Sequence, residues 1–155
     1  MIKKPEQGMT IIVKTITRYT VVLILLFGIY FIMNGHLVHG GGFAGGIIVA
    51  LSYMHVMLAF GKEVAMKRIT DKTIQFLVGL GSLSFLILGI LGMTKGYFMY
   101  NFFRTPGVDY IGKPFSLFSS GIMPLMNLAI CLAVASGFFS VFLALIFYRL
   151  SEDKK

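Results

Sequence analysis

Three histidines are the residues of this sequence that could bind or transfer a proton near neutral pH. His36 and His39 flank a glycine-rich turn, whereas His55 lies inside a long apolar segment. An ionisable residue in such a segment is by default a candidate for a proton or hydration path. The alternative is a neutral ring held by a structural hydrogen bond, with Ser52, one helical turn earlier, or a neighbouring subunit as the partner. Both interpretations stay open.

The histidines do not predict a metal site. Two histidines at a turn supply fewer than the three or four ligands that zinc takes, so we expect no metal there. We also expect none of these residues to be catalytic. A haem-binding or electron-transfer four-helix membrane protein is an alternative, because histidines on facing helices can ligate haem iron. Helical rise separates His36 from His55 by roughly 20 to 30 Å in depth, too far for the two to hold one haem. We therefore expect no cofactor.

The elements that must position these residues are membrane helices. The chain has 155 residues, of which 57% are hydrophobic and 13% are charged, and its mean hydropathy is +0.85. Charged residues are absent from 19–33, 42–60, 74–93 and 116–148. About 20 residues of helix cross the hydrocarbon core of a bilayer. The sequence predicts an all-α integral membrane protein with about four transmembrane helices in a single domain, 1–155, with spans near 14–33, 41–60, 74–93 and 121–148.

Lysine and arginine residues predict the orientation of the chain. They cluster before the first span, between the second and third spans, and after the fourth, while the other two links hold few. By the positive-inside rule, both termini face the cytoplasm of a multi-pass protein in the cell membrane. The formal net charge of +8 then reflects topology and lipid headgroups. It does not indicate a nucleic-acid partner, because no basic cluster lies on a soluble surface.

Small residues crowd the first half of the second span, at Gly41, Gly42, Gly45, Gly46 and Ala50. Small side chains spaced by three or four residues let another helix backbone approach closely. In lipid, such packing replaces the hydrophobic force that holds soluble helix bundles together. We expect these five residues to be helix-packing positions, against a helix of this chain or of a neighbour.

The four apolar stretches that form the centres of the predicted spans contain no Asp, Glu, Lys or Arg. A protein that exchanges cations needs an intramembrane carboxylate or an unwound backbone site to bind them. This absence argues against an autonomous small transporter and favours a subunit whose partners supply the charged pathway. The polar residues that could face a hydrated ion or proton path are His36, His39, Ser52, His55 and Asn127.

Two stretches carry a family resemblance. Gly35-His36 followed by Gly40-Gly41-Gly42-Phe43-Ala44-Gly45-Gly46 resembles the GHxxPGGGFxGG signature of the B subunit of multisubunit Mrp-type sodium/proton antiporters. A second stretch, from Gly121 to Leu128 and on to Gly137-Phe138, resembles the helix-four region of archaeal members. His39 stands where the family usually has proline, and Ala133 stands where many relatives carry lysine.

The resemblance implies a non-catalytic accessory subunit. Such a subunit packs with other membrane subunits of an antiporter-type complex and helps to line or seal a sodium path, while larger partners move protons. B-type subunits also occur in archaeal membrane-bound hydrogenases and related sulfur-reductase complexes. The resemblance therefore implies either a free-standing antiporter or a respiratory complex, with sodium ions and protons as the transported species.

Overall fold

The structure is a computed structural model that describes residues 9–61, 70–103 and 116–152. These residues form four long α-helices and a short 3-10 helix: α1 (Ile11–Met33), α2 (Gly41–Phe60), α4 (Asp71–Gly92), η1 (Leu117–Ser120) and α5 (Met123–Glu152). Each long helix is apolar enough and long enough to cross a membrane. The prediction of an all-α protein with about four membrane helices is confirmed. The cytoplasmic position of both termini and the single domain stay predictions.

Three helices extend beyond the spans that hydropathy predicts. Helix α1 begins at Ile11, α4 begins at Asp71, and α5 runs on to Glu152. The guanidinium carbon of Arg18 lies 5.8 Å from the centre of the Phe60 ring. A long basic side chain can thus remain in a helix while its charged end reaches towards the helix terminus. Helical hydrogen bonding need not stop where the hydrocarbon stops. Most of the basic residues that predict the orientation lie outside the described residues.

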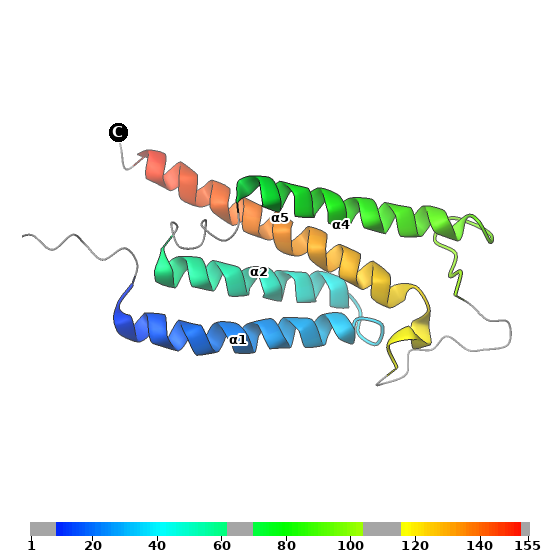
Figure 1. The fold of residues 1–155 in the computed structure, drawn as a ribbon, viewed down its shortest axis with the longest axis horizontal. Coiled ribbons are helices and arrows are strands. Elements are labelled where there is room, and N and C mark those ends of the chain that lie inside the picture. Colours follow the sequence, from blue (N-terminus) through cyan, green and yellow to red (C-terminus); the bar gives the residue numbers. More distant parts are fainter. Residues whose placement is uncertain (1–8, 62–69, 104–115, 153–155) are drawn as a thin grey trace, which may run out of the picture.

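The four long helices stand in a row, in the order α1, α2, α5 and α4 (Figure 1). Helices α1 and α2 form one antiparallel hairpin, and α4 and α5 form another. The second helix of each hairpin lies in the middle of the row, and these two helices run in the same direction. Consequently, the end of α1 and the starts of α2 and α5 meet at one end of the row.

Helices α2 and α5 approach closely because glycines of α2 face the backbone of α5. A Cβ atom placed on Gly42 would lie 2.6 Å from the carbonyl oxygen of Asn127. One placed on Gly46 would lie 3.0 Å from the carbonyl oxygen of Cys131. Ala50, one turn further along α2, is buried. A larger side chain at either glycine would therefore displace one helix from the other.

Another side of α2 faces α1 in the same manner. A Cβ atom on Gly45 would lie 2.6 Å from Cγ1 of Ile32 and 3.2 Å from the carbonyl oxygen of Gly28. At the start of α2, Gly41 lies directly against Gly35 of the preceding turn. The small residues of α2 therefore divide between two neighbouring helices, which explains why they occupy more than one face.

The second hairpin also depends on a glycine. A Cβ atom on Gly81 of α4 would lie 2.5 Å from the backbone nitrogen of Ala133 in α5. Towards the other end of these helices, a buried apolar cluster joins α2, α4 and α5 through Met57, Ile74, Phe139 and Leu143. Helix α5 is thus held on one side by α2 and on another by α4.

Replacing Gly42 with alanine tests the α2–α5 contact. The added methyl group would meet the backbone of Asn127, so we expect Gly42→Ala to lower the free energy of unfolding by about 1–3 kcal/mol, as overpacking does. Gly79→Ala is the matched control, because a Cβ atom at Gly79 meets nothing within 4 Å. Thermal unfolding of both variants in detergent, followed by circular dichroism, measures the difference. Equal midpoints would contradict the contact.

Candidate functional site

A polar cleft of about 440 Å³ opens at the end of the row where α2 and α5 begin. Its walls come from the α1–α2 turn, the segment that follows α4, η1, and the first turns of α5. It is lined by residues 35–40, Asn101, Ser120, Met123 and Asn127. Three of the residues proposed from the sequence for an ion or proton path therefore lie together: His36, His39 and Asn127.

The α1–α2 turn is closed by its own backbone. The N–H groups of Leu37 and Val38 donate to the carbonyl oxygen of Asn34 at 2.9 and 3.2 Å. Gly40 takes a φ of +76°, a left-handed conformation that glycine adopts without steric cost. The ring of His36 donates from Nδ1 to the carbonyl oxygen of Met33 at 3.1 Å. His39 is exposed on the cleft wall.

Asn127 connects this turn to α5. A Cβ atom on Gly35 would lie 2.6 Å from Nδ2 of Asn127, while Gly42 fits against the backbone of the same residue. The two glycines therefore hold Asn127 from two sides, with its side chain in the lining of the cleft. Among the described residues, the amide of Asn127 has no hydrogen-bond partner. The two stretches that carry the family resemblance thus contact each other here.

Asn101, which the sequence did not single out, secures the opposite wall. Its Nδ2 donates to the carbonyl oxygen of Ser120 at 3.2 Å, and the N–H of Ile122 donates to its Oδ1 at 3.3 Å. Between them, Gly121 takes a φ of +68° and leaves the space that the Asn101 side chain occupies. These bonds tie the segment after α4 to the start of α5. No sequence signal marked this asparagine, because its partners follow it by about twenty residues.

His55 and Ser52 lie outside the cleft, further along α2, and they do not pair with each other. The hydroxyl of Ser52 donates to the carbonyl oxygen of Val49 in its own helix at 2.7 Å. The partner of His55 is instead Thr17 of α1, whose Oγ1 lies 3.4 Å from Nε2 of the ring. Thr17 is 1% exposed. Of the partners considered for His55, Ser52 is thus not the one in this structure, because a serine hydroxyl readily bonds the preceding turn of its own helix.

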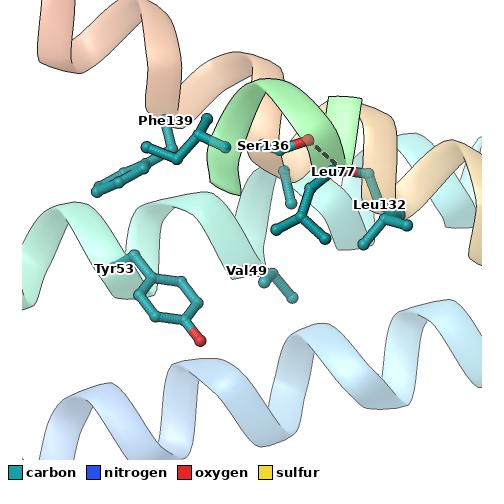
Figure 2. Close-up of a pocket in the computed structure, with 8 residues that line it drawn as sticks. Val49, Tyr53, Leu77, Leu132, Ser136 and Phe139 are labelled. Atoms are coloured by element: carbon teal, nitrogen blue, oxygen red, sulfur yellow. Dashed lines mark hydrogen bonds between the residues drawn. The ribbon is translucent and has the colours of Figure 1, made fainter. Parts of the chain in front are cut away.

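A smaller apolar pocket of about 210 Å³ lies over α5 between α2 and α4 (Figure 2). Figure 2 shows the hydroxyl of Tyr53 pointing away from Phe139 and Ser136. The hydroxyl of Ser136 is bonded to the backbone of its own helix. The pocket thus offers hydrocarbon rather than ion ligands. In the described part of the chain, no group of three or more His, Cys, Asp or Glu residues could hold a metal ion.

Comparison with known proteins identifies the family. Residues 12–140 match the family model described as a domain related to the MnhB subunit of Na⁺/H⁺ antiporter. The chain belongs to the MnhB family. It is 33% identical over 129 residues to an uncharacterized protein of Methanocaldococcus jannaschii, across 83% of this chain and 49% of that protein. It is 32% identical over 105 residues to a Staphylococcus saprophyticus protein that carries the name of an mnhB2 antiporter subunit, across 68% and 62%.

A solved structure shares the MnhB fold of this chain. A chain of the membrane-bound sulfane sulfur reductase, an archaeal respiratory membrane complex, matches with a TM-score of 0.69 and 26% identity. The match covers 90% of this chain and 61% of that one. The resemblance stated from the glycine motif is confirmed, and the protein is a multi-pass membrane protein of the MnhB type. The chain spans about half to three fifths of the length of these relatives.

Replacing Thr17 with valine tests the contact with His55. Valine keeps the volume of threonine but removes the hydroxyl, so we expect a loss of about 0.6 to 1.7 kcal/mol of stability, the range for hydrogen bonds between membrane helices. Thr15→Val is the control, because the Thr15 hydroxyl bonds Ile11 within its own helix. Thermal unfolding and the NMR signals of the His55 ring report the change. A His55 signal unmoved by Thr17→Val would contradict the pairing.

Proposed function

We propose that this chain is a non-catalytic subunit of an Mrp-type sodium/proton antiporter module, either free-standing or within a respiratory hydrogenase or sulfur-reductase complex. The observation that carries the proposal is the MnhB match over residues 12–140. The match to a respiratory membrane complex supports the second setting. The chain packs with other membrane subunits and lines part of a sodium path, while its partners supply the groups that move protons.

The shape of the fold supports packing with partner subunits. Because the helices stand in a row, α1 and α4 are each covered mainly by one neighbour. Large apolar side chains remain exposed on both, for example Leu23 on α1 and Phe76 on α4, each at 67%. In a membrane such surfaces contact lipid or other helices, and small gains in packing decide between the two. The row therefore leaves ample surface for a larger assembly.

The polar cleft supports the proposal that this end of the chain lies at a hydrated part of the sodium path. His36, His39 and Asn127 supply imidazole and amide groups beside a space large enough for water. Ser52 and His55 form a second polar position deeper in α2, with His55 held by Thr17. Neither position supplies an intramembrane carboxylate, the common coupling group of cation exchange. The chain therefore contributes to a path rather than completing one.

Transport by reconstituted protein tests this division of labour. We expect liposomes that contain only this chain to show no sodium-driven proton movement above empty vesicles, because the chain lacks a coupling carboxylate. Liposomes that contain the whole complex should show it. A pH-sensitive dye inside the vesicles measures the movement after a sodium jump. Exchange by the chain alone would overturn the subunit function, and a Soret absorbance band would support the haem-binding alternative.

A further inference from the structure

The cleft offers hydrogen-bond donors and contains no acidic side chain among its described lining residues. We propose that it receives a carboxylate side chain from a neighbouring membrane subunit, bound by His39 and by the amide of Asn127. This inference rests on the proposed function, because it requires a partner subunit. It specifies which functional group of the partner subunit enters the cleft.

Two of the polar lining groups are available to a ligand. Asn101 is already used at both ends of its amide, by Ser120 and by Ile122. The imidazole of His39 and the amide of Asn127 have no hydrogen bond within the described part of the chain. Each can donate an N–H. A carboxylate accepts several hydrogen bonds and can therefore bind both N–H donors at once.

Asn127 is held firmly enough to act as a recognition group. Its backbone lies against Gly42, and its Nδ2 lies where a side chain at Gly35 would be. A donor fixed by its surroundings loses little entropy when a ligand binds. His39, by contrast, is exposed in the turn, so it can adjust to the incoming side chain.

Helices α2 and α5 begin at this end of the row and helices α1 and α4 end here, so the positive and negative ends of their dipoles offset one another. The side-chain charge found here among the described residues favours an anion. Lys95, at the same end of the row, adds a cation and donates to the carbonyl oxygen of Phe102. A bare sodium ion would meet Lys95 and the two N–H donors without a carboxylate to balance them. With a partner carboxylate in place, the cleft would hold the acidic oxygens that the spans of this chain lack.

The substitution His39→Lys allows the contact to be trapped as a covalent bond. In the intact membrane complex, carbodiimide should join His39→Lys to an Asp or Glu of another subunit, and peptide mass spectrometry should locate both residues. Thr94→Lys is the matched control, because Thr94 is exposed at the same end of the row but does not line the cleft. We expect a cross-link yield about tenfold higher at position 39, as expected for a preformed charge contact.

A charge reversal gives the complementary result. His39→Glu should lower retention of this chain in the purified complex about tenfold, whereas Thr94→Glu should leave it unchanged. Equal retention of the two variants, no cross-link at position 39, or a cross-link only to a second copy of this chain or to an aminolipid would each overturn the inference. Those outcomes leave the proposed function intact if the unmodified chain still purifies with other membrane subunits. Failure to purify with any of them would instead contradict the proposed function.

Discussion

Backbone meets backbone where Gly42 of α2 faces Asn127 of α5, and the rest of the structure depends on this approach. In lipid, apolar side chains gain little by leaving one hydrocarbon environment for another, so helices associate through close packing and a few polar contacts. Glycine makes that packing possible by removing the side chain that would keep the axes apart. Because α5 also packs against α4, the close approach of α2 and α5 joins the two hairpins into a row.

The same contact builds the polar cleft. The turn before α2 must end close to the start of α5, and Gly35 then fits against the side chain of Asn127. Asn101 completes the arrangement by tying the segment after α4 to the backbone at Ser120 and Ile122. Packing and site are therefore not separate features of this protein. A change that moves α2 away from α5 should also open the cleft.

Much of the fold is predictable from the sequence, because a charge-free apolar stretch of about 20 residues has few alternatives to a membrane helix. The order of the helices in the row is not, since each helix of this composition offers several faces of similar apolarity. The glycines of α2 illustrate the limit. Their spacing predicts close contact with another helix, but it does not say that Gly42 and Gly46 face α5 while Gly45 faces α1.

The polar residues show a second limit. His55 was evident as an ionisable residue in an apolar segment, whereas its partner Thr17 lies 38 positions earlier, a separation that no local pattern encodes. Ser52 was the nearer choice, yet a serine in a helix satisfies its hydroxyl with the preceding turn. No local sequence pattern indicates Asn101 either, because its hydrogen-bond partners Ser120 and Ile122 are also distant in the sequence. The roles of His36, His39 and Asn127 in ion movement stay proposals.

Disulfide formation between α2 and α5 tests the central contact most directly. A Cβ atom on Gly46 would lie 3.0 Å from Cβ of Val134, so the displacement that a cysteine at position 46 causes moves the two Cβ atoms towards the usual separation of about 3.5 to 4.5 Å. In a Cys131→Ser background, mild oxidation of membranes should link Gly46→Cys with Val134→Cys and should not link Gly46→Cys with Gly137→Cys. Equal yields for the two pairs, or none for the first, would contradict the account.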